Sequence, residues 1–91
     1  MINERKWRIG GYAAFTLYAA AAFHDATISQ RILLRTKCRP MLARMREFEG
    51  DDHNWPLAAR SLLMRIHEVM GENWRPKGEW SDYINALLKE E

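Results

Sequence analysis

Residues 9–23 read IGGYAAFTLYAAAAF, a run of fifteen positions without a charge that ends at the pair His24–Asp25. Alanine has the highest helix propensity of any residue, so the stretch from Tyr12 onward is predicted to be helical. Both sides of this helix are apolar on a helical wheel, and such a helix is normally buried in its own domain or against a partner. Any part of it that the other helices leave uncovered is therefore the first place to look for a partner.

A membrane span and an export signal are the two alternative interpretations of this stretch. A spanning helix needs roughly 20 apolar residues, whereas this run has fifteen. A basic start, an apolar middle and the small residues at 20–22 fit a secretory signal. The middle, however, is rich in alanine and contains two glycines and a single leucine. We therefore favour a buried helix and expect no membrane partner.

The composition predicts one globular domain over residues 1–91. The chain is 47% hydrophobic and 29% charged, which is typical of a folded domain rather than a disordered segment. Its one cysteine, Cys38, permits no internal disulfide and fits a reducing compartment, so we expect a cytoplasmic location. Cys38 falls on an apolar helix face, where a small buried hydrophobe is expected rather than a nucleophile.

Helix start and stop signals divide the first half of the chain. Asn3 is the expected cap of a first helix, and Gly10–Gly11 is a potential break in it. A second helix begins at Thr27 or Ser29 and ends before Gly50. Pro40 lies in its middle and either kinks the helix or starts a new one.

The third helix is the most clearly marked, with Asn54 as its expected cap, Pro56 in its first turn and Gly71 at its end. Eight of its apolar residues lie within about 140° of the wheel. Leu57 and Met64, one heptad apart, point away from this stripe. A short last helix follows from Gly78 or Ser81. The predicted fold is all-α: a small irregular bundle of four to five short helices around the alanine-rich N-terminal helix.

The charge of the chain is unevenly distributed. Residues 1–46 carry nine Lys and Arg against two acids, and residues 47–91 carry five against ten. Residues 31–46 hold six positive charges and no acid. Four arginines share one side of this predicted helix next to an apolar face: Arg31, Arg35, Arg39 and Arg46.

Three interpretations of this arginine stripe stay open. The guanidinium groups lie in solvent or pair with the acids of the second half, they bind an acidic protein partner, or they follow a nucleic-acid backbone through salt-dependent contacts. No helix-turn-helix, zinc-finger or RNA-recognition motif supports the last interpretation, and no aromatic residues alternate with the arginines to stack on bases. Nucleic acid is therefore not the favoured partner.

His24–Asp25, at the end of an alanine-rich helix, resembles the His–Asp pair of the HD-type metal-dependent phosphohydrolases. The resemblance covers two residues, and it implies a divalent metal and a hydrolase as a minor alternative. The further histidines and aspartate of such sites have no match in spacing here, although Asp51, Asp52, His53 and His67 are present. No glycine-rich phosphate loop or Gly-x-Ser-x-Gly elbow occurs. We therefore expect no catalytic residue, no metal and no cofactor.

The sequence favours a small non-enzymatic interaction protein, an inhibitor, adaptor or regulator of phage or mobile-element type that binds another protein through a helical surface. A homodimer is one way to cover the first helix. The alternative is a nucleic-acid-binding regulator that uses the basic 31–46 helix. Tryptophan is enriched at interface hot spots, and two tryptophans lie beside basic residues. The candidate contact residues are Arg31, Arg35, Arg39, Arg46, Trp7, Trp74, Leu57 and Met64.

Overall fold

The computed structural model describes residues 4–89, with the side chains of residues 12–82, 84 and 86, and this part of the chain forms four helices without a strand. Helix α1 spans Glu4–Asp25, α2 spans Ile28–Glu47, α3 spans Asn54–Met70 and α4 spans Glu79–Lys89. The four helices pack against one another, which confirms the predicted all-α class. None of the helices in this part of the chain is long and apolar enough to cross a membrane.

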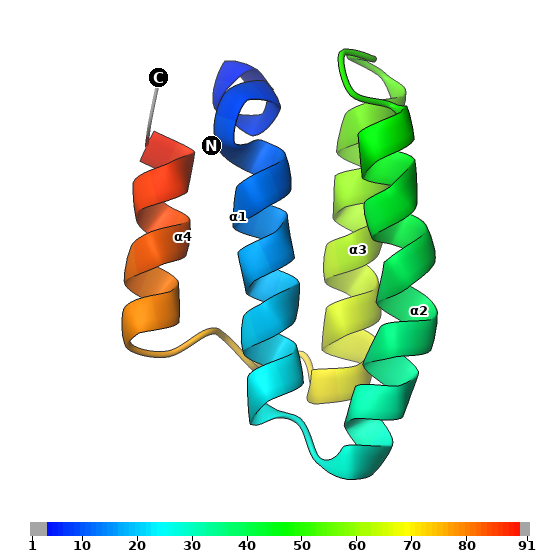
Figure 1. The fold of residues 1–91 in the computed structure, drawn as a ribbon, viewed down its shortest axis with the longest axis vertical. Coiled ribbons are helices and arrows are strands. Elements are labelled where there is room, and N and C mark those ends of the chain that lie inside the picture. The colour runs from blue at the N-terminus through cyan, green and yellow to red at the C-terminus, as the bar shows by residue number, and fades with distance from the viewer. Residues whose placement is uncertain (1–3, 90–91) are drawn as a thin grey trace.

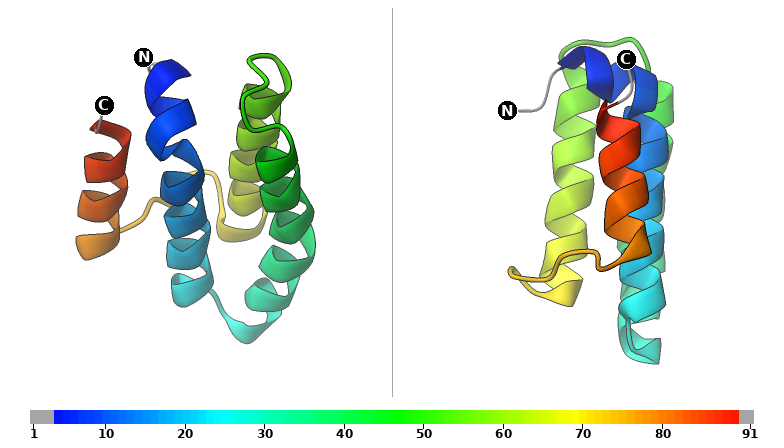
Figure 2. Two further views of the ribbon diagram at one scale, coloured as in Figure 1. Left: turned by 45° about the horizontal axis from the view of Figure 1, so that its top comes forward. Right: turned by 90° about the vertical axis from the view of Figure 1, so that its left-hand side faces the viewer.

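Helix α1 packs against each of the other three helices (Figure 1). Helices α2 and α3 form an antiparallel pair on one side of α1, and α3 lies behind α1 and α2 in the view of Figure 1 (Figure 2, right). Helix α4 packs on the opposite side, where its described residues contact α1 and neither of the other two helices. The resulting arrangement is flat, with Cα extents of 35 × 26 × 17 Å. The apolar helix α1 is thus covered from two opposite sides.

Helix α1 runs without interruption through Gly10–Gly11, so the expected break is wrong. Each glycine costs a helix about 1 kcal/mol relative to alanine. The alanine-rich turns that follow, packed against three helices, offset this cost. Asn3, the expected cap, lies outside the described residues.

Thr27 begins α2 with a reciprocal capping box. The backbone N–H of Gln30 donates to the Thr27 hydroxyl at 3.2 Å, and the Thr27 N–H donates to the Gln30 side-chain oxygen at 2.9 Å. The helix then continues through Pro40 to Glu47, so a new helix does not start at the proline. Pro40 has no N–H to offer to the Thr36 carbonyl, and both residues are exposed.

The carboxylate of Asp51 caps the start of α3. The prediction that Asn54 is the cap is therefore wrong. The Asp51 carboxylate accepts the backbone N–H of Asn54 at 2.9 Å and that of His53 at 3.0 Å. These hydrogen bonds lower the pKa of Asp51. The Asn54 side chain itself donates to the same carboxylate at 2.8 Å. At the other end the helix stops before Gly71, whose φ of 101° favours glycine, as predicted.

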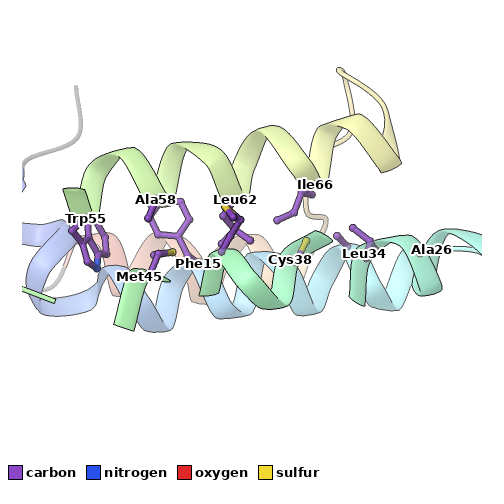
Figure 3. Packing of buried hydrophobic residues seen from close by; sticks show 12 residues of the cluster. Phe15, Ala26, Leu34, Cys38, Met45, Trp55, Ala58, Leu62 and Ile66 are labelled. Atoms are coloured by element: carbon purple, nitrogen blue, oxygen red, sulfur yellow. The ribbon is translucent and has the colours of Figure 1, made fainter. Parts of the chain in front are cut away.

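Buried side chains of α1, α2 and α3 form one hydrophobic cluster (Figure 3). Met45, Leu62 and Ile66 are its largest fully buried members. The rings of Phe15 and Trp55 meet edge to face, with their centroids 6.0 Å apart. Ile84 of α4 is buried but does not belong to this cluster, because α4 packs on the far side of α1. The buried members of the cluster are Phe15, Ala22, Ala26, Leu34, Cys38, Met41, Met45, Trp55, Ala58, Ala59, Leu62 and Ile66.

Candidate functional site

A groove lies between α1 and α2, and no described residue of α3 or α4 lines it. Its volume is about 240 Å³, and its surface is almost entirely apolar. The wall from α1 carries no charge, whereas the wall from α2 includes two arginines. The lining residues are Thr16, Ala19, Ala20 and Phe23 on α1, and Leu34, Arg35, Cys38, Arg39 and Leu42 on α2. We refer to this feature as the α1–α2 groove.

The small side chains of α1 leave this groove open. Helix α4 covers one flank of α1, and the α2–α3 pair covers another. Between them Ala13 and Thr16 stay exposed, and Ala20 is half-buried. Alanine side chains at 19 and 20 are too short to reach across to α2 and fill the space between the two helices. Within residues 12–25 this strip is therefore apolar surface of α1 that the other described helices do not cover.

Arg31 uses its guanidinium group within the fold. Its Nε donates to the Phe23 carbonyl at 2.9 Å, and its Nη2 donates to the His24 carbonyl at 3.3 Å. These carbonyls belong to the last turn of α1, where backbone acceptors lack helical partners. The guanidinium also lies 5.2 Å from the centre of the Phe23 ring. Arg31 thus joins α2 to the end of α1.

The other three arginines of the stripe lean toward α1 or line the groove. Arg46 lies over the Tyr12 ring at 5.4 Å, and Arg35 lies 5.7 Å from the centre of the Phe23 ring. Arg35 and Arg39 line the α1–α2 groove and also a shallow depression on the outer side of α2, together with Thr36, Pro40 and Ala43. The guanidinium groups at 35 and 39 are exposed and stand one helical turn apart.

Within residues 12–82 the acids of the second half do not pair with Arg35 or Arg39. Glu68 of α3 instead accepts from Lys37 at 3.1 Å and from Arg65 at 3.2 Å. The hydrogen bond from Lys37 is the main cause that lowers the pKa of Glu68. Among the described residues, the guanidinium groups of Arg35 and Arg39 therefore have no acidic partner. They are available to solvent or to another protein.

Two isoleucines extend the apolar surface beside these arginines. Ile28 is 79% exposed and Ile32 is 64% exposed, and both lie on the side of α2 that carries Arg35 and Arg39. The sequence interpretation missed them, as it missed the α1 wall of the groove. The sequence already indicated that these two side chains are exposed, because both isoleucines fall outside the apolar face on the helical wheel.

Leu57 and Met64 project from the outer side of α3, 48% and 62% exposed, as the helical wheel indicates. They do not line the α1–α2 groove. Two exposed arginines of the same helix, Arg60 and Arg65, are close to them in sequence. The side chain of Trp7, another candidate contact residue, lies outside the described side chains.

Trp74 packs inside the fold rather than projecting from its loop. Its indole N–H donates to the Asp25 carboxylate at 3.1 Å, and its ring meets that of Tyr18 at 5.5 Å and 88°. His67 completes the cluster, with its ring centre 6.1 Å from that of Trp74. The half-buried indole thus joins the loop after α3 to the end of α1.

His24 and Asp25 lie at the same end of α1, where the His24 side chain is largely exposed. The His24 Nδ1 lies 3.5 Å from the Asp25 carboxylate, and its ring lies 6.2 Å from that of Trp80. No group of three or more metal-ligating side chains occurs among the described residues. The pair therefore gains no third ligand in this part of the chain.

No family model, no curated protein and no solved structure matches this chain. The α1–α2 groove, with its apolar lining and its two arginines, is the feature of this fold that best fits a binding role.

Proposed function

We propose that this protein is a small, non-enzymatic, cytoplasmic binding protein, an inhibitor, adaptor or regulator, that recognises another protein through the α1–α2 groove. One observation carries the proposal: the uncovered apolar strip of α1 lies directly beside Arg35 and Arg39, which have no acidic partner among the described residues. Arginine and apolar surface in this combination are typical of protein interfaces.

The shape of the groove supports a protein partner. Grooves between two helices are a recurrent way to bind a helical segment, because an amphipathic helix places its apolar side between the two walls. Ile28 and Ile32 add exposed apolar surface next to the groove, which a partner would remove from water. Arg31 is already engaged with α1, so fewer arginines are free for a nucleic-acid backbone than the stripe of four indicates.

The proposal is tested by site-specific photo-crosslinking in cells that produce the protein. A benzophenone amino acid replaces Thr16, which is exposed at the groove, and in a control variant it replaces Glu72, which is exposed in the loop after α3. We expect a discrete protein adduct from position 16 that is absent from position 72. Adducts with nucleic acid only, or equal protein labelling at both positions, would overturn the proposal.

A further inference from the structure

We propose that the occupant of the α1–α2 groove is an amphipathic helix of another protein that carries acidic residues along one side of its apolar face. This inference rests on the proposed function and specifies the chemistry of the partner. It follows from three features of the groove: its dimensions, the chemistry of its two walls and the spacing of its charges.

The dimensions fit a short helical segment. The α2 wall extends from Leu34 to Leu42, a rise of about 12 Å. The α1 wall, from Thr16 to Phe23, has a similar length. This corresponds to about two turns of a bound helix. Alanines at 19 and 20 keep the α1 wall low, so that a partner backbone can approach α1 closely.

The two walls differ in charge. The α1 wall consists of small or aromatic uncharged residues, and it therefore requires apolar or small residues on the side of the partner that it contacts. The α2 wall carries Arg35 and Arg39, separated by a rise of about 6 Å. Carboxylates four residues apart on a helix that lies along α2 have this same spacing, so each acid meets one guanidinium.

A second copy of the chain is a poorer match for the groove. Among the described residues its large exposed hydrophobic side chains are Ile28, Ile32 and Leu33 on α2, the helix that itself carries Arg35 and Arg39, and Leu57 and Met64 on α3. Helix α3 carries the exposed Arg60 and Arg65, which would approach Arg35 and Arg39 with like charge. A flat lipid surface is also a poorer match, because the apolar lining is recessed between two helices. A ligand that offered only phosphate groups would leave the apolar lining of the groove exposed to water.

The test selects peptides of about four helical turns from a displayed helix-forming library, with the intact 91-residue chain as bait. We expect the selected peptides to carry apolar residues three and four positions apart with acids four positions apart beside them. The affinity of the synthesised peptides is then measured by fluorescence anisotropy at low and moderate salt. It should fall as the salt concentration rises.

Charge reversal on both partners identifies the binding surface. Arg35→Glu with Arg39→Glu should weaken a selected peptide by about tenfold or more, since two attractive pairs become repulsive. The control, Arg44→Glu with Arg60→Glu, changes the net charge equally at exposed arginines outside the groove and should retain near wild-type affinity. A peptide with lysines in place of its acids should bind the Arg35→Glu/Arg39→Glu variant more tightly than it binds the wild-type protein.

Several outcomes would overturn the inference. These are failure of the library to yield a binder, binders without acidic residues, and equal effects of the two double variants. The inference would also be overturned if the protein bound duplex DNA, or vesicles rich in phosphatidylserine, in place of peptide and this binding depended on Arg35 and Arg39. If Thr16 crosslinks a protein in cells through a segment that is not an acidic helix, this inference fails while the proposed function stands.

Discussion

The hydroxyl of Tyr18 on α1 donates to Nε2 of His67 on α3 across 2.8 Å. The direction of this hydrogen bond follows from the other ring nitrogen. Nδ1 of His67 lies 3.1 Å from the Gly71 carbonyl, which can only accept, so in the neutral imidazole Nδ1 carries the proton and Nε2 accepts. The pair links α1, α3 and the C-terminal cap of α3 in one chain of hydrogen bonds.

Loss of the Tyr18 hydroxyl should therefore destabilise the fold without disturbing its shape. Tyr18→Phe keeps the ring contact with Trp74 but leaves Nε2 of His67 without its donor. We expect the free energy of unfolding, measured with urea, to fall by about 1 kcal/mol. Tyr12→Phe is the control, because the ring contact of Tyr12 with Arg46 does not use the hydroxyl. Equal effects of the two variants would contradict the role of the hydrogen bond.

The two sides of α3 should respond in opposite ways to truncation. Ile66 is fully buried, so Ile66→Ala should lower the free energy of unfolding by about 2–5 kcal/mol. Met64 is 62% exposed, so Met64→Ala should change it by less than about 0.5 kcal/mol. Chemical denaturation of both variants measures the difference. A large loss from Met64→Ala would show that this residue is covered in the folded protein.

Pro40 should lower the stability of α2. A proline in a helix interior costs up to about 3 kcal/mol relative to alanine. Pro40 is exposed, and Pro40→Ala restores a backbone N–H for the Thr36 carbonyl. We expect the free energy of unfolding to rise by about 1 kcal/mol or more, with a matching increase in Tm. A decrease would mean that the proline fixes a shape of α2 that the packing on α1 and α3 requires.

The thiol of Cys38 should be nearly inert in the folded protein. Its side chain is buried, and burial raises the pKa of the thiol to about 11, an effect that the nearby Lys37 partly opposes. At pH 8 only about one thiol in a thousand is then ionised. Labelling with an aromatic disulfide reagent should be slow in buffer and fast in denaturant. Rapid labelling of the folded protein would contradict the burial of this residue.

The same shift predicts a loss of stability in alkali. The pKa of Cys38 in the folded protein is above its ordinary value of 9.0, so the unfolded chain loses this proton first. The contribution of the Cys38 thiol to the stability of the fold is fully present below pH 9 and is lost as the pH rises to about 11. Burial also raises the pKa of Tyr18, which acts in the same direction. Urea unfolding from pH 8 to 11 should show this decline, and Cys38→Ala should make it shallower. An unchanged slope in that variant would exclude the thiol as a cause.

Local sequence signals predicted those parts of the fold that depend on local chemistry. Thr27 and Gly71 mark helix ends because their side-chain and backbone preferences act within a few residues. The prediction failed at Gly10–Gly11 and for the cap of α3. At Gly10–Gly11 the packing of α1 against three helices decides the structure, which no local signal reports. At the start of α3 a local group decides it, because the carboxylate of Asp51, three residues before Asn54, accepts the backbone N–H of Asn54.

The groove itself was only partly predictable. The sequence indicated that the apolar first helix needs more cover than a short chain supplies, and it located the arginines of residues 31–46. It did not show which strip of α1 stays open, because that depends on α4 packing on one side and the α2–α3 pair on the other. Nor did it separate Arg31, which caps α1, from Arg35 and Arg39, which face the groove.

Titration of the isotope-labelled protein with a selected acidic peptide, followed by ¹H–¹⁵N NMR, tests the groove as the binding site most directly. We predict that the largest shift changes occur at Thr16, Ala20, Arg35 and Arg39, with little change at Leu57 and Met64. Changes centred on Leu57 and Met64, or no saturable change at any position, would contradict the assignment of the α1–α2 groove as the binding surface.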